Sequence, residues 1–175
     1  EKNIGCTVDA EESDRLELSL DIIEQVFSDA SLAGWDGFGV VVQAYQKRTP
    51  YTIDHLADMA RRAGRRLQVR LVKGAYWDAE IKRAQIEGYP GYPVFTRKQN
   101  TDVSYLACAK RLFTHAAAIY PMFATHNAHT IAAVRSIANG GVYEHQKLHG
   151  MGDDLYAEVV PADRLGLPCR VYAPV

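Results

Sequence analysis

The chain of 175 residues has almost no charge imbalance and no long apolar run, and each shortage excludes a class of protein. Its 20 Lys and Arg residues are nearly matched by 21 Asp and Glu residues, so the cationic surface that binds a nucleic-acid backbone is missing. No stretch approaches the roughly 18 apolar residues that span a bilayer, and the first residues lack the basic-then-apolar pattern of a secretion signal. We therefore expect a globular protein with no nucleic-acid partner.

The sequence is equally poor in cysteine and in metal-binding motifs. Cys6, Cys108 and Cys169 are widely spaced and contain no CxxC pair, which argues against a disulfide framework or a zinc site. Reduced thiols of this kind are typical of a cytoplasmic protein. The six histidines form no HExxH motif, and no GxGxxG follows the first apolar run. We therefore predict no metal site, and a Rossmann dinucleotide-binding fold is disfavoured.

Apolar runs alternate along the chain with segments of helical periodicity. Strands are predicted at 4–8, 38–42, 67–72, 122–125, 142–148 and 169–173. Helices are predicted at about 16–27, 52–63, 77–86, 101–112, 130–138 and 154–160. The alternation predicts βα units and a parallel sheet, and the continuous apolar character of several strands is typical of a sheet covered on both faces.

Polar residues recur at the carboxyl end of one predicted strand after another. They are Asp9, Glu11, Gln43, Arg70, Lys73, His126, Asn127, His145, Gln146, Arg170 and Tyr172. In a barrel these strand ends converge on one mouth, where TIM-barrel enzymes place their active sites. We therefore predict an α/β fold of the (β/α)8 TIM-like class. Because a whole barrel usually needs about 250 residues, we expect a truncated portion with about six strands.

The strand that ends at residue 72 has the most unusual continuation. It runs directly into Lys73 and Gly74, followed by Tyr76 and Trp77, and a glycine there permits close approach of a ligand to the backbone. The lysine could equally be a surface cation, and the aromatic side chains could pack in the core. Two further interpretations stay open. Lys73 could form a Schiff base, as in a class I aldolase-type barrel, or the chain could be a non-catalytic, self-associating fragment.

Six motifs, in order along the chain, strongly resemble those of the proline dehydrogenase family. They are Arg-Leu-Val-Lys-Gly-Ala-Tyr-Trp-Asp at 70–78, Tyr-Pro-Val-Phe-Thr-Arg-Lys at 92–98, Thr-Asp-Val-Ser-Tyr at 101–105, Phe-Ala-Thr-His-Asn-Ala at 123–128, Leu-His-Gly-Met-Gly at 148–152 and Arg-Val-Tyr-Ala-Pro-Val at 170–175. The resemblance covers essentially the whole chain. It is strongest to the bifunctional bacterial members of the family.

The resemblance implies a distorted (β/α)8 barrel that binds FAD and oxidises L-proline to 1-pyrroline-5-carboxylate, in proline catabolism to glutamate. In the family a hydride passes from proline to the flavin. Quinone then reoxidises the cofactor, which implies a cytoplasmic parent protein with a peripheral contact to the inner membrane. Open sheet edges in a truncated barrel additionally predict self-association into a homo-oligomer.

The resemblance also implies roles for individual residues. Arg70 would lie near the hydride-accepting nitrogen of the flavin, where a fixed cation stabilises the negative charge of the reduced ring. Gln43 would bond the isoalloxazine edge, Trp77 would stack near the adenine, and residues 125–127 would contact the ribityl and pyrophosphate region. The implied cofactor-binding set is Gln43, Arg70, Val72, Lys73, Gly74, Trp77, Thr125, His126, Asn127 and Gln146. The implied substrate-binding set is Asp9, Leu71, Tyr76 and Tyr172, with Asp9 holding Tyr172 in place, and the implied catalytic set is Arg70, Tyr76, Tyr172 and Asp9.

In one respect the sequence departs from the family pattern. Family members continue past the 170–175 motif into a helix whose paired arginines clamp the carboxylate of proline, whereas this sequence ends at Val175. A bidentate arginine pair is the strongest way to orient a carboxylate. We therefore expect residues 1–175 to be a partial proline dehydrogenase barrel domain, lacking the first strands and the clamp helix and impaired in turnover.

Overall fold

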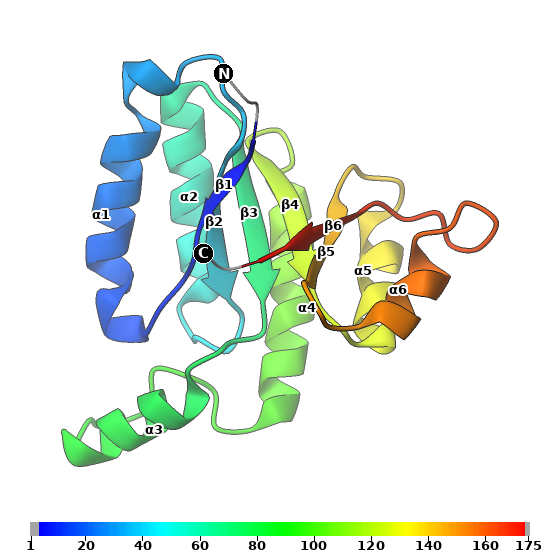
Figure 1. The fold of residues 1–175 in the computed structure, drawn as a ribbon. Coiled ribbons are helices and arrows are strands. Elements are labelled where there is room, and N and C mark those ends of the chain that lie inside the picture. Colours follow the sequence, from blue (N-terminus) through cyan, green and yellow to red (C-terminus); the bar gives the residue numbers. More distant parts are fainter. Residues whose placement is uncertain (1–3, 174–175) are drawn as a thin grey trace.

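The computed structural model describes residues 4–173, in which strands and helices alternate (Figure 1). The strands are β1 (Cys6–Val8), β2 (Phe38–Gln43), β3 (Leu67–Val72), β4 (Ile119–Ala124), β5 (Glu144–Leu148) and β6 (Cys169–Tyr172). The α-helices are α1 (Leu16–Phe27), α2 (Thr49–Ala63), α3 (Trp77–Ile86), α4 (Lys98–Thr114), α5 (Ala128–Ala138) and α6 (Asp153–Val159). Two short 3-10 helices are η1 (Ser13–Arg15) and η2 (Ala30–Leu32).

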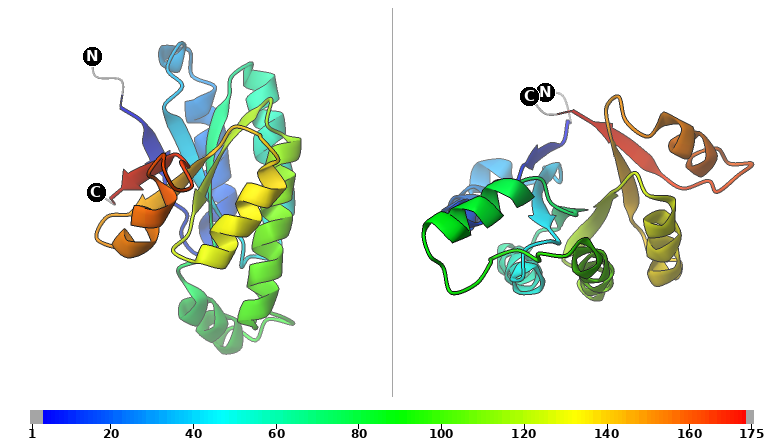
Figure 2. Two further views of the ribbon diagram at one scale, coloured as in Figure 1. Left: turned by 90° about the vertical axis from the view of Figure 1, so that its right-hand side faces the viewer. Right: turned by 90° about the horizontal axis from the view of Figure 1, so that it is seen from below.

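All six strands belong to one parallel sheet, and each lies beside its neighbour in sequence, in the order β1-β2-β3-β4-β5-β6. The sheet curves into a half-barrel with the helices around its convex side (Figure 2). This arrangement confirms the predicted α/β fold and the truncated (β/α)8 barrel. Within residues 4–173, β1 and β6 are the edge strands of the sheet.

Side chains on alternate sides of each strand separate the hydrophobic core from the concave face. Leu67, Val69 and Leu71 of β3 are fully buried in the main core, which they share with residues of α1, α2 and α4. Arg70 lies between them in sequence and lines the concave side. Helices therefore cover one face of the sheet, and the other face carries polar side chains. Within residues 4–173, no helix is both long and apolar enough to cross a membrane.

Helices α2 and α4 begin three residues earlier than their sequence patterns predicted. α2 begins at Thr49 instead of residue 52, because Pro50 fits the first turn, where the backbone N–H has no partner in the helix. α4 begins at Lys98 instead of residue 101, so the Thr101-Asp102 pair does not cap it. The Asp102 carboxylate instead accepts hydrogen bonds from Lys98 and from a lysine of the β3–α3 connection.

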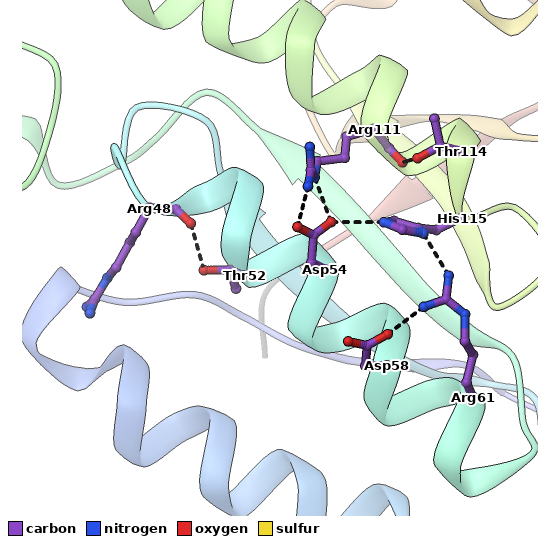
Figure 3. Close-up of polar contacts among 8 residues, drawn as sticks. All are labelled: Arg48, Thr52, Asp54, Asp58, Arg61, Arg111, Thr114 and His115. Atoms are coloured by element: carbon purple, nitrogen blue, oxygen red, sulfur yellow. Dashed lines mark hydrogen bonds and ion pairs between the residues drawn. The ribbon is translucent and has the colours of Figure 1, made fainter.

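A polar network joins the outer surfaces of α2 and α4 (Figure 3). The Asp54 carboxylate accepts two hydrogen bonds from Arg111, the one from Nε at 2.6 Å, and lies 2.9 Å from His115 Nε2. Arg61 contacts His115 Nδ1 at 2.8 Å and Asp58 at 2.5 Å. Because arginine can only donate, Nδ1 of His115 is the acceptor and Nε2 carries the hydrogen. The network fixes the packing of two helices that support β2, β3 and β4.

Candidate active site

The carboxyl ends of the strands surround a cavity of about 550 Å³. Residues in or directly after all six strands line this cavity, joined by one residue of α4. They are Asp9, Ala10, Val41, Gln43, Val72, Lys73, Gly74, Ala75, Tyr76, Lys98, Ala124, Thr125, His126, Asn127, Leu148 and Tyr172. The convergence expected at the mouth of a barrel is therefore present.

Arg70 lines a neighbouring cavity on the concave side of the sheet, which shares Asp9 and Tyr172 with the first, and its side chain is only 7% exposed. Its Nε donates a hydrogen bond of 2.6 Å to Gln146 Oε1, and its guanidinium carbon lies 3.9 Å from the centre of the Tyr172 ring. A guanidinium nitrogen lies 3.7 Å from Asp9 Oδ1. Burial lowers the pKa of Arg70, and Tyr172 and Asp9 oppose this effect. An arginine stays charged even so, which makes this a fixed cation held in place by three neighbours.

A second row of buried polar groups orients Gln146. Its Nε2 donates to Glu144 Oε1 at 2.8 Å, which turns Oε1 of the same amide toward Arg70. Glu144 in turn accepts hydrogen bonds of 2.8 and 3.0 Å from Arg170. Burial alone would raise the pKa of Glu144, but the hydrogen bonds from Arg170 and Gln146 hold that pKa below its ordinary value. Glu144 is therefore an anion that fixes the amide next to Arg70.

Gln43 connects two of the loops around the cavity. Its Nε2 donates to the Glu11 carbonyl at 2.8 Å, and its Oε1 accepts from the Ala75 N–H at 3.0 Å. Each atom retains one hydrogen-bonding position for a ligand. Tyr76 follows in the second loop and lines the same cavity. The Gln43 amide thus serves both as a link between loops and as a group that a ligand can reach.

Lys73 is engaged in an ion pair. Its Nζ lies 2.6 Å from Asp102 Oδ1, and Lys98 binds the other oxygen of Asp102 at the same distance. These two lysines lower the pKa of Asp102. A Schiff-base nucleophile needs a free amine that can reach a carbonyl, whereas Nζ of Lys73 is held by the Asp102 carboxylate. The geometry therefore does not favour the aldolase-type interpretation of Lys73.

A second cavity of about 450 Å³ adjoins the first and shares Lys73, Gly74 and Lys98 with it. Trp77 lines this second cavity with an indole that is partly exposed and whose N–H donates to the Phe95 carbonyl at 3.0 Å. A Cβ on Gly74 would lie 2.4 Å from the Tyr45 ring, and the φ of Gly74 is +149°. Only glycine fits this turn between the two cavities.

The N-terminus of α5 points at the first cavity. Asn127 caps the helix, since its side-chain oxygen accepts from the Thr130 N–H at 2.9 Å. Thr125 Oγ1 accepts from the Asn127 N–H at 3.2 Å, and His126 Nε2 lies 3.4 Å from the Leu148 N–H. The first residues of a helix carry partial positive charge, so this end of the cavity favours an anionic group.

A sequence model of the proline dehydrogenase family matches residues 1–175. The chain belongs to the proline dehydrogenase family. It is 61% identical over 180 residues to the bifunctional protein PutA of Klebsiella aerogenes and 56% identical over 182 residues to that of Rhizobium meliloti. Each match covers 99% of this chain and 14% of the relative, so the chain spans about a seventh of the length of these relatives.

Solved structures of proline utilization A (PutA) share the fold of this proline dehydrogenase segment. A single-residue mutant of the Bradyrhizobium japonicum protein superposes with a TM-score of 0.94 at 55% identity, covering 99% of this chain and 18% of that one. The protein from Bdellovibrio bacteriovorus inactivated by N-propargylglycine superposes with a TM-score of 0.90 at 34% identity, covering 98% and 18%.

Two predicted residues lie elsewhere, namely Leu71 of the implied substrate-binding set and His145, which was expected at the barrel mouth. Leu71 is fully buried in the main core, on the face of β3 opposite to Arg70, so the structure does not bring it to the cavity. His145 likewise faces the helix layer, where it packs against Phe123 and Tyr143. Both positions have one cause, since neighbouring residues of a strand point to opposite faces.

Two other details differ from the expectation. Asp9 lies against Arg70, and no hydrogen bond joins it to Tyr172 within the described residues, so its contact to Tyr172 is indirect. Leu148 and Lys98 line the cavity but were not predicted as site residues. Both lie within motifs that resemble those of the family, at 148–152 and 92–98. Their place in these motifs is the sequence signal that could have identified them.

Proposed function

We propose that this chain forms the flavin-binding part of a proline dehydrogenase that uses FAD to oxidise L-proline to 1-pyrroline-5-carboxylate in proline catabolism. The observation that supports this most directly is the buried Arg70, held by Gln146, Tyr172 and Asp9 on the concave side of a half-barrel. A fixed cation at such a site stabilises negative charge that develops on a neighbouring ring system. Membership of the family agrees with this chemistry.

The donor set around the two cavities fits FAD. A dinucleotide with two ring systems needs two adjoining spaces, and the cavities share the residues Lys73, Gly74 and Lys98. Lysine side chains and the N-terminus of α5 suit its phosphates, and the partly exposed Trp77 suits its adenine. The residues proposed to hold FAD are Gln43, Arg70, Val72, Lys73, Gly74, Trp77, Thr125, His126, Asn127 and Gln146. When bound, the flavin supplies the acceptor for the hydride of proline.

Proline is proposed to bind between Asp9, Tyr76 and Tyr172. Tyr172 stacks on the Arg70 guanidinium and provides a flat wall for the pyrrolidine ring. The Asp9 carboxylate carries a charge that attracts the ring nitrogen of proline in its cationic form. Tyr76 lies in the same cavity lining, between the Gln43-bound Ala75 and the start of α3. These three side chains orient the substrate, and Arg70 tunes the electrostatic potential of the site.

The wider setting is proposed from the family resemblance. The intact protein would be cytoplasmic and bifunctional, would pass its electrons to quinone at the inner membrane, and would form a homo-oligomer. We expect the 175 residues alone to turn over proline poorly, because their concave face and sheet edges are uncovered in the described structure.

The visible absorption spectrum of the intact protein tests the proposed function. We expect flavin bands that bleach under anaerobic conditions when L-proline is added. A protein that stays colourless after incubation with FAD, or a flavin that proline does not bleach, would contradict the proposal. Borohydride trapping of a carbonyl substrate on Lys73 would instead support the aldolase-type alternative, and a colourless protein with no activity would support a non-catalytic role.

A further inference from the structure

Helix α3 stands apart from the sheet and contacts the rest of the molecule through few buried groups (Figure 1). Most of its residues are exposed, yet the Glu80 residue is only 2% exposed. Its carboxylate accepts a hydrogen bond of 2.7 Å from the Ser13 hydroxyl and another from the Ser13 backbone N–H. Ser13 is 67 positions away in sequence and opens η1, directly after the loop that carries Asp9. A buried carboxylate thus joins α3 to that loop.

An ion pair of Arg83 and the position of Tyr45 also support a specific role for Glu80. Arg83, one turn further along α3, forms an ion pair with Asp14 of η1. Burial is the main cause that raises the pKa of Tyr45, and the negative charge of Glu80 is the next. The ring of Tyr45 packs against Gly74. Glu80 therefore lies between the loop after β1 and the turn at Gly74. Full burial of a carboxylate is unfavourable unless hydrogen bonds satisfy it, which Ser13 does here.

Glu80 and Gln43 form two separate hydrogen-bonded bridges between the same two segments of the chain. Gln43 links the Glu11 carbonyl to the Ala75 N–H, and Glu80 links Ser13 to α3. The first segment, 9–13, carries Asp9, and the second segment, 74–80, carries Tyr76. The two bridges together fix the separation of two side chains that line the first cavity. Burial raises the pKa of Tyr76, and the next causes are the nearby carboxylates of Glu12, Glu11 and Asp9. This effect agrees with the short separation between the two segments.

We propose that Glu80 is a positioning residue, which sets the spacing between the Asp9 segment and the Tyr76 segment and thereby the fit of the substrate. The predicted effect on substrate binding rests on the proposed function, whereas the hydrogen bonds that Glu80 forms do not depend on it. Glu80 is absent from the linings of both cavities, so it would act only through Ser13 and α3. Its loss should therefore weaken substrate binding more than it slows the chemical step.

The test uses three variants of the intact protein, which are Glu80→Gln, Ser13→Ala and the double variant. Ser13→Ala removes only the hydroxyl donor. The matched control is Glu87→Gln, an exposed carboxylate at the end of the same helix. Hydrogen exchange measured by mass spectrometry should become faster in segments 10–16 and 74–86 of Glu80→Gln and stay unchanged in β3. The KM for proline should rise on the order of tenfold while kcat changes less, and the double variant should show less than the sum of both effects. The control should match the unmodified protein in both measurements.

Three results would overturn the proposal. Unchanged exchange in both segments of Glu80→Gln would show that Glu80 does not hold them together. Faster exchange with an unchanged KM would show that the spacing is irrelevant to the substrate. A fall in kcat alone, at constant KM and with a lower melting temperature, would show a merely stabilising role. If the unmodified protein does not oxidise proline, the proposed function fails, and the exchange data still decide whether Glu80 fixes the spacing.

Discussion

At the scale of single residues, Arg70 depends on neighbours from three different strands or loops. Gln146, Tyr172 and Asp9 touch its guanidinium, and Glu144 orients Gln146. A lysine would keep the charge but would lose the Nε hydrogen bond and the flat surface that faces Tyr172. The position therefore demands arginine and not only a cation.

We predict that Arg70→Lys lowers kcat/KM for proline by about 100-fold, the scale of removing a fixed electrostatic group at a reaction centre. Steady-state kinetics of the intact protein measure this. Arg62→Lys, at an exposed ion pair between α2 and α1, is the matched control and should retain full activity. Equal activity of Arg70→Lys and the unmodified protein would show that charge alone suffices.

His145 gives a second prediction at this scale, for stability against pH. It is fully buried, and burial lowers its pKa to about 4. Between pH 6.5 and 4 the unfolded chain binds a proton that the folded chain excludes, so the free energy of unfolding falls by roughly 2 kcal/mol at pH 5 relative to pH 7. Urea denaturation at both pH values should show this loss, and His145→Phe should reduce it. His129→Phe, at an exposed site on α5, should leave the loss unchanged.

At the scale of elements, the structure depends on contacts between helices that sequence patterns do not specify. Asp54 and Arg111 lie 57 positions apart, and their side chains meet only because α2 and α4 pack side by side on the sheet (Figure 3). Arg111, with a smaller contribution from His115, lowers the pKa of Asp54 against the raising effect of partial burial. The ionised carboxylate is therefore the form that stabilises the fold.

We predict that Asp54→Asn reduces the free energy of unfolding by roughly 1 kcal/mol at pH 7, the upper range for a partly exposed ion pair. The stabilisation by Asp54 should be present above its ordinary pKa and should disappear as the pH falls through the lowered pKa. Chemical denaturation of the variant and of Asp58→Asn provides the comparison, because the Asp58 carboxylate bonds Arg61 of its own helix and reaches α4 only through that arginine. An equal loss in both variants would contradict a special role for the Asp54 network.

At the scale of the whole molecule, the half-barrel leaves β1 and β6 as sheet edges and surrounds an uncovered cavity of about 690 Å³ on its concave side. Unpaired strand edges bind other strands, and apolar surface favours association. Val171 of β6 is 54% exposed at one of these edges. The described residues thus offer a surface on which a second copy can pair.

We predict that the 175 residues, prepared alone, self-associate as their concentration rises. Sedimentation velocity over a concentration series measures this. Val171→Lys places a charge on the β6 edge and should weaken the association, whereas Ser136→Lys on the exposed side of α5 should not. A single monomeric species at every concentration would refute the prediction.

The order of strands and helices, the parallel sheet and the polar strand ends could be predicted from the amino-acid sequence, because they follow from local periodicity and from the fixed direction of parallel strands. It could also indicate Arg70, Gln146 and Tyr172, since all three lie on predicted strands and the family resemblance implies a role for each. Three features could be recognised only in the folded molecule: Leu71 faces the core, Glu144 orients Gln146, and Glu80 reaches Ser13. The physical reason is that these contacts join elements far apart in sequence, and the curvature of the sheet and the packing of α3 decide which side chains meet.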